Sequence, residues 1–91
     1  MEFEWDEDKR RSNIERHGVD FVLAAKIFLN PTLEAPDDRE NYDEERMIAI
    51  GQWEGNCIVV VYTWRGKTRR IISAWKAGKN DREAYYEEIY D

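Results

Sequence analysis

Residues 69–89 read RRIISAWKAGKNDREAYYEEI, and this stretch decides the fold class. Apolar and polar side chains alternate over residues 69–76, which is the pattern of a β-strand. Gly78 interrupts that pattern, and Asn80 then stands three residues before Glu83. This spacing predicts an N-cap and a capping box at the start of a helix. The chain therefore passes from a sheet into a C-terminal helix.

Two more β patterns precede this strand. They are RMIAIGQW at residues 46–53 and NCIVVVYTW at residues 56–64. Short loops centred on Gly55 and Gly66 separate the three runs, and both are typical of tight hairpins. A fourth short strand is expected at residues 32–35. These runs predict an antiparallel meander.

The first third of the chain predicts two helices. Asp6 is a suitable N-cap for the first, and Gly18 a suitable left-handed residue at its end. Asp20 is the expected N-cap of the second helix, which Asn30-Pro31 ends. Residues 3–5 could form a short strand. We predict one α+β domain over residues 1–91, with an N-terminal helix pair, a meander of three to four strands and a C-terminal helix.

Composition restricts the classes of function. The single cysteine, Cys57, can form neither an intramolecular disulfide nor a Cys-based zinc site, and a buried reduced thiol suggests a cytoplasmic protein. The longest apolar run is far shorter than the ~20 residues that a membrane span needs, so no membrane association is expected. The acidic residues at 6–8 and 37–45 are interpreted as caps and solubilising charge, with no metal and no cofactor.

Charge is distributed unevenly along the chain. The whole chain has a net charge of −6, but residues 46–82 contain eight Lys or Arg and only two acidic residues. Exposed charges act over a Debye length of roughly 8–10 Å, so a cationic surface can bind phosphate on an acidic protein. We expect the eight basic side chains to converge on one accessible surface.

Side-chain alternation along residues 69–76 predicts which face of the strand each cation occupies. It puts Arg69, Ile71, Ser73 and Trp75 on one face and Arg70, Ile72, Ala74 and Lys76 on the other. We expect a tip zone of Arg65, Lys67 and Arg69, and a strand-end zone of Lys76, Lys79 and Arg82. Arg46 could join either zone.

Aromatic residues and the single histidine have alternative interpretations. Trp75 is the best candidate for stacking on an unpaired base, whereas Trp64 is expected in the core. Of Tyr85 and Tyr86, one is expected to pack and the other to face the groove. His17 lies at a helix C-terminus, where an imidazolium is stabilised by the dipole, and is interpreted as a capping residue rather than a catalytic one.

Several blocks together resemble one family. They are FEWD at residues 3–6, HGVDF at 17–21, VVYTWR at 60–65 and RRIISAWKA at 69–77, with Lys9, Asn13, Glu45-Arg46 and residues 49–51 in addition. The chain resembles BrnT-type toxins, the ribonuclease components of BrnT/BrnA toxin–antitoxin operons, over essentially its whole length. The resemblance implies a RelE-like fold and RNA as the substrate. One departure is Trp75, which stands where the family usually has Arg.

A ribonuclease without metal needs a base, cations that stabilise the phosphorane and an acid. A two-histidine mechanism is excluded because the chain has one His. The predicted catalytic residues are Arg46, Arg69, Arg70, Lys76 and Arg82, and the predicted RNA-binding residues are Arg65, Lys67, Trp75, Lys79 and Tyr85. The alternative is a weak or inactive module that binds an antitoxin and regulates an operon. In either case the resemblance implies a hetero-oligomer with a ribbon-helix-helix, BrnA-like antitoxin.

Overall fold

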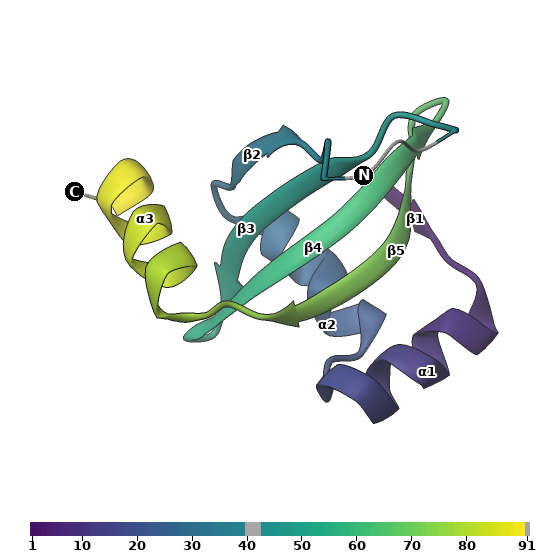
Figure 1. Ribbon diagram of the computed structural model, residues 1–91, viewed down its shortest axis with the longest axis horizontal. Helices are drawn as coiled ribbons and strands as arrows, with labels where there is room; N and C mark the ends of the chain where they lie inside the picture. Colours follow the sequence, from purple (N-terminus) through teal and green to yellow (C-terminus); the bar gives the residue numbers. More distant parts are fainter. Residues whose placement is uncertain (40–42, 91) are drawn as a thin grey trace.

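The computed structural model describes residues 1–39 and 43–90, and the predicted α+β class is confirmed (Figure 1). The elements are β1 (Glu2–Glu4), α1 (Glu7–His17), α2 (Phe21–Lys26), the 3-10 helix η1 (Ile27–Leu29), β2 (Leu33–Pro36), β3 (Met47–Trp53), β4 (Asn56–Arg65), β5 (Thr68–Lys76) and α3 (Lys79–Tyr90). The predicted acidic loop lies partly outside the described residues. No described helix has the length and apolar character that crossing a membrane would require.

The sheet has five strands in the order β1-β5-β4-β3-β2, where three to four were predicted. The predicted meander is confirmed, because β2, β3, β4 and β5 pair antiparallel in sequence order. The difference is β1, which pairs in parallel with β5 from Glu2 opposite Thr68 to Glu4 opposite Arg70. The sheet is therefore mixed, and β1 forms one of its edges.

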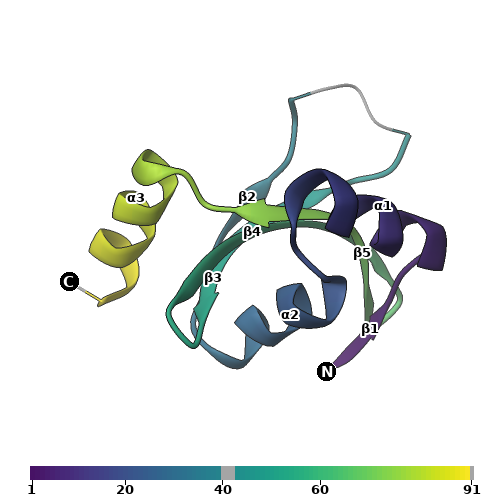
Figure 2. The same ribbon diagram turned by 90° about the horizontal axis from the view of Figure 1, so that it is seen from below.

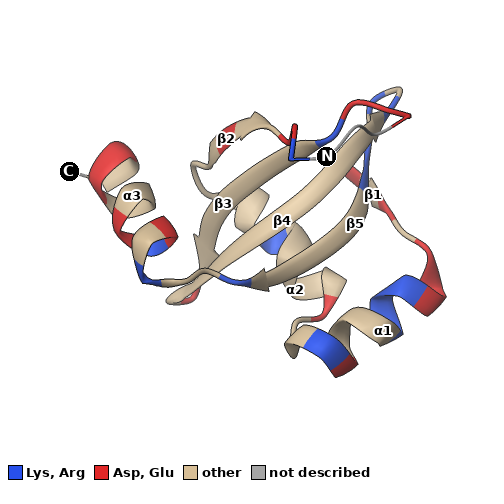
Figure 3. Ribbon diagram, in the orientation of Figure 1, with Lys and Arg blue, Asp and Glu red and all other residues tan. Residues whose placement is uncertain are grey.

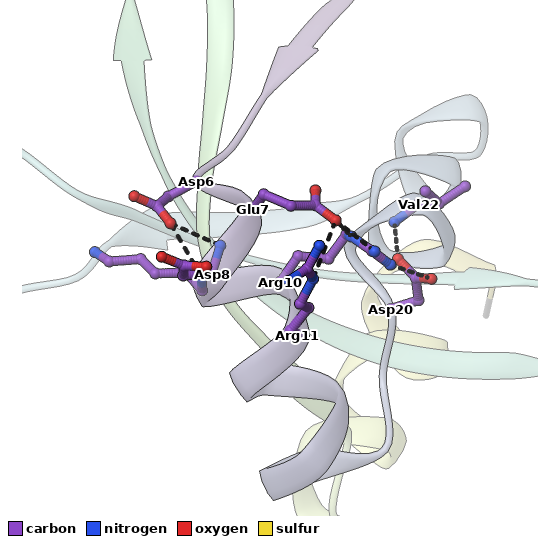
Figure 4. Close-up of polar contacts among 8 residues, drawn as sticks. Asp6, Glu7, Asp8, Arg10, Arg11, Asp20 and Val22 are labelled. Carbon is purple, nitrogen blue, oxygen red and sulfur yellow. Dashed lines mark hydrogen bonds and ion pairs between the residues drawn. The ribbon is translucent and has the colours of Figure 1, made fainter.

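The helix ends follow the local sequence signals at α1 and α2 (Figure 4). The Asp6 carboxylate accepts hydrogen bonds from the backbone N–H groups of Asp8 and Lys9, at 2.9 and 3.2 Å. Gly18 ends α1 with a φ of 70°. Arg10 pairs with both Glu7 and Asp20, which connects α1 to the start of α2. The predicted N-cap of α3 is wrong, because that helix begins at Lys79 and Asn80 lies inside its first turn.

Helices cover both faces of the sheet (Figure 2). On one face α2 and η1 bury a core that includes Phe21, Ile27, Phe28, Val60 and Tyr62. On the other face α3 covers one end of the sheet, where Tyr85 packs with Cys57 and Val59. The Tyr85 hydroxyl donates to the Pro31 carbonyl at 2.7 Å, which connects α3 to the segment before β2. Cys57 is a buried free thiol, as expected, and burial raises its pKa.

A bulge in β5 changes the predicted faces of that strand. Val61 pairs with Ser73 and Tyr62 pairs with Ile71, so Ile72 has no partner in β4. An extra residue in one strand reverses the alternation beyond it. Arg69 and Ile71 consequently share the face of Ala74, whereas Arg70 shares the face of Ser73 and Trp75. The prediction that Arg69 lies on the Trp75 face is wrong for this reason.

The side chain of Asn13 joins α1 to the outer edge of β5. Its amide nitrogen donates to the carbonyls of Val19 and Ala74 at 2.9 and 2.8 Å. Its amide oxygen accepts from the Ala74 backbone N–H at 3.2 Å and from the Ser73 hydroxyl at 3.3 Å. The pairing of β1 with β5 ends at Arg70. Asn13 therefore supplies hydrogen-bond partners for the backbone of Ala74, at the part of the β5 edge that β1 does not cover.

Replacing Asn13 with Ala should lower the free energy of unfolding by about 2–4 kcal/mol, because several buried backbone groups lose a partner at once. The measurement is equilibrium unfolding in urea. The control is Ser12→Ala on the same helix, expected to change stability by no more than about 0.5 kcal/mol. A stability of Asn13→Ala equal to that of the control would contradict the role given to this amide.

Candidate functional site

A groove between α1 and β5 collects cationic side chains. It has a volume of about 220 Å³, and its lining includes the cations Lys9 and Arg16 and the imidazole of His17, all from α1. The others are polar or apolar: Ser12, Asn13, Ile72 and Ser73. None of these lining residues carries a carboxylate. The groove is therefore a concave surface that is lined by cations and by no acidic side chain.

The local structure of α1 explains why these residues share one surface. Residues three or four apart lie on the same face of a helix. Lys9, Ser12, Asn13, Arg16 and His17 follow this spacing, so the side of α1 that meets β5 is polar throughout. Asn13 holds this side against the strand through the bonds to Ser73 and Ala74. The bulge at Ile72 lies opposite and contributes to the other wall.

Trp75 lies further along β5, beside the groove residue His17. Its indole ring lies 6.1 Å from the His17 ring, measured between centroids. The guanidinium of Arg39 lies over the same indole at 5.6 Å. Arg39 is itself bound to the buried carboxylate of Asp37 by hydrogen bonds of 2.7 and 2.9 Å. The half-buried indole is thus fixed beside the imidazole.

The predicted tip zone does not form one cationic surface. Arg65 is exposed but pairs with Glu44 at 3.2 Å, and Lys67 is exposed in the turn. Arg70, on the opposite face from Arg69, pairs with Glu4 of β1. Carboxylates from the N-terminal half of the chain therefore neutralise two of the predicted cations.

Arg69 lies in an aromatic cluster. Its guanidinium is 4.3 Å from the ring centroid of Phe28, 4.5 Å from that of Trp64 and 5.3 Å from that of Tyr62. The Tyr62 hydroxyl donates to Glu34, and burial together with this bond raises the pKa of Tyr62. Tyr62 consequently stays a neutral hydrogen-bond donor. Trp64, expected in the core, is 47% exposed and covers Arg69 from outside.

The predicted strand-end zone is partly assembled. Lys76 and Arg82 both line a pocket of about 180 Å³ where β5 leads into α3. Lys79 is exposed as the first residue of α3 but does not line this pocket. Arg46 directly precedes β3 at the tip end of the sheet, where Met47 pairs with Tyr62; it is half-buried, and its carbonyl accepts from the Asp37 N–H at 2.7 Å. Tyr85 is fully buried, so its ring has no surface for an RNA base.

The expectation that eight cations converge on one surface is wrong (Figure 3). The tip zone and the strand-end zone lie at opposite ends of β5, and nine residues of strand separate them by roughly 26 Å. Sequence reasoning also missed the groove residues Lys9 and Arg16, because they belong to an acidic segment. The signal that could have found them is the polar stripe at helical spacing that ends at His17.

The fold and this groove define a small α+β domain with a cationic site at one edge of its sheet. Residues 5–81 match the family of the ribonuclease toxin BrnT of type II toxin–antitoxin systems. The chain therefore belongs to the BrnT family, which indicates a ribonuclease toxin whose partner is an antitoxin. A comparison with curated proteins finds no match.

The aromatic cluster predicts a structural role for Arg69. Arg69→Ala should lower the free energy of unfolding by about 1–3 kcal/mol, because three aromatic rings lose their contacts with the guanidinium and with the apolar part of the side chain. Lys67→Ala in the adjacent turn should change it by no more than about 0.5 kcal/mol. Both values come from urea unfolding. An Arg69→Ala protein of unchanged stability that no longer cleaves RNA would instead assign Arg69 to the reaction.

Proposed function

We propose that the protein is a metal-independent endoribonuclease toxin that cleaves single-stranded RNA in the groove between α1 and β5. The observation that supports this most is the composition of the groove, where an imidazole, an ammonium and a guanidinium line one hollow with no carboxylate among them. Arg suits phosphate because its planar fork binds two oxygens at once. Imidazole is the side chain that most readily takes a proton near neutral pH.

The proposed reaction is attack by the RNA's own 2′-hydroxyl. His17 accepts the proton of that hydroxyl while its oxygen forms a bond to the adjacent phosphorus. The bond from phosphorus to the 5′-oxygen breaks, and that oxygen takes a proton from solvent. Arg16 and Lys9 stabilise the negative charge that develops on the phosphorane oxygens. The products are a 2′,3′-cyclic phosphate and a free 5′-hydroxyl.

No step in this reaction uses a metal ion. In the described part of the chain, no three His, Cys, Asp or Glu side chains are grouped so that they could hold one. The cations of the groove supply the charge that a metal would otherwise contribute. The residues that we predicted from the sequence, such as Lys76 and Arg82, lie outside this groove and are not given a part in the bond-breaking step.

The test is incubation of the purified chain with single-stranded RNA in EDTA. We expect cleavage with cyclic phosphate ends, and a loss of about 10²–10⁴-fold in rate for His17→Ala. Lys9→Ala and Arg16→Ala should each be slower than the wild type. The control is Arg11→Ala, an exposed cation of α1 outside the groove. Cleavage that requires added Mg²⁺ would overturn metal independence, and full activity of His17→Ala would overturn the site.

A second candidate function is supported by Trp75. Its indole lies against His17, at the position where BrnT-type sequences usually have Arg. In this alternative the groove is catalytically inactive and the chain serves to bind an antitoxin and to regulate an operon. For both candidates we propose a ribbon-helix-helix antitoxin whose acidic or aromatic residues meet the cationic groove.

Replacing Trp75 with Arg separates the two candidates. If the chain is an inactive module, the wild type should bind its antitoxin without cleaving RNA, and Trp75→Arg should gain cleavage and arrest growth on expression. If the chain is a ribonuclease, the wild type should already arrest growth. The measurements are RNA cleavage and colony growth after induction. A toxic wild type would rule out the inactive module.

A further inference from the structure

A second cationic hollow lies further along the same strand. This is the pocket of about 180 Å³ at the end of β5, lined by Lys76, Ala77, Arg82, by Gly55 of the β3–β4 turn and by Asn56 and Cys57 at the start of β4. Two of these side chains are cations, Asn56 adds an amide, and none of the six is acidic. Three further hollows that contain Arg or Lys have Glu or Asp in their linings, and Arg82 also lines one of these beside Glu83 and Glu87.

Trp75 stands between the two hollows along β5, although it lines neither. Ser73 lines the groove and Lys76 lines the pocket, and three residues of extended strand separate them by roughly 10 Å. Trp75 lies between these two residues in β5, and its indole is beside His17 of the groove. In chain order β5 therefore carries a cationic groove, an aromatic ring and a cationic pocket, and Lys76 leaves the strand on the opposite face from Trp75. We call this series the β5-edge track.

We propose that the β5-edge track binds one extended single strand of RNA, with the scissile phosphate in the groove and a second phosphate in the pocket of Lys76 and Arg82. This inference rests on the proposed function, because it assigns the groove to the scissile phosphate. In it Lys76 and Arg82 are binding residues that hold the substrate away from the reacting atoms. The indole of Trp75 supports the nucleotide between the two phosphates.

The dimensions favour a single strand. Each hollow is smaller than the 300–1,000 Å³ typical of a pocket for a whole drug-sized ligand, so it fits a phosphate group better than a complete nucleotide. Double-stranded RNA is bound across successive grooves by long surfaces rather than by two small hollows. Alternation of cations and an aromatic ring is instead the arrangement that binds single strands.

The test measures binding rather than cleavage. His17→Ala, in the full chain, is titrated into 5′-labelled oligoribonucleotides of two to eight nucleotides, and anisotropy is read at several salt concentrations. Lys76→Ala or Arg82→Ala, added to this background, should weaken binding of the longer oligomers by about tenfold and leave the dinucleotide unchanged. The slope of log K against log salt should fall by about 0.7 for each phosphate that the variant no longer neutralises.

The matched controls are Lys26→Ala for the lysine and Arg11→Ala for the arginine, since both are exposed cations away from the track. The proposal is overturned if Lys76→Ala and Arg82→Ala weaken binding no more than these controls, or weaken the dinucleotide equally. It is also overturned if the two variants weaken binding of the antitoxin but not binding of RNA, because the pocket would then be part of the antitoxin interface.

The outcomes also separate this inference from the proposed function. A wild-type chain that fails to cleave RNA but binds it with the expected dependence on length would overturn the ribonuclease and support the track. A wild-type chain that cleaves RNA without any effect of Lys76 or Arg82 on the longer oligomers would support the ribonuclease and overturn the track.

Discussion

The hydrogen bonds of one amide determine where the cationic groove can exist. Asn13 bonds both backbone groups of Ala74, and it also accepts from the Ser73 hydroxyl and donates to the carbonyl of Val19, just before α2. A buried strand edge without partners would be unfavourable, and a helix side chain here replaces a neighbouring strand. Because this contact fixes the position of α1, the residues on either side of Asn13 along the helix form one wall of the groove. The groove is a consequence of how the edge of β5 is completed.

Local signals predicted most of the secondary structure, and long-range pairing accounts for what they did not predict. Asp6, Gly18 and Asp20 act within a few residues of themselves, so their roles could be assigned from the sequence. The pairing of Glu4 with Arg70 connects residues at opposite ends of the chain, and no local pattern indicates it. The bulge at Ile72 could not be predicted either, because apolar and polar residues in RRIISAWK already alternate as in a regular strand. One unpaired residue was sufficient to move Arg69 into the aromatic core.

The same reasoning explains why the candidate site was only partly predicted. Counting charge by segment assumes that neighbours in sequence are neighbours in space, but an extended strand separates its ends by many ångströms. In the fold, the cations of residues 46–82 are divided between the two ends of β5. Glu4 and Glu44, from the acidic segment, form ion pairs with two of them. Lys9 and Arg16 are the opposite case. Their segment is acidic overall, but the helix turns its carboxylates elsewhere and these two side chains toward β5.

The acidic character of the whole chain then has a physical role in what the groove can bind. A net charge of −6 disfavours general attraction of nucleic acid at long range. At short range the groove still presents Lys9 and Arg16, because none of its lining residues is a carboxylate. For the proposed RNA substrate, attraction would therefore depend on a phosphate coming close to the groove cations. The same argument applies to the proposed antitoxin, whose contact with the cationic groove would depend on close approach rather than on long-range attraction.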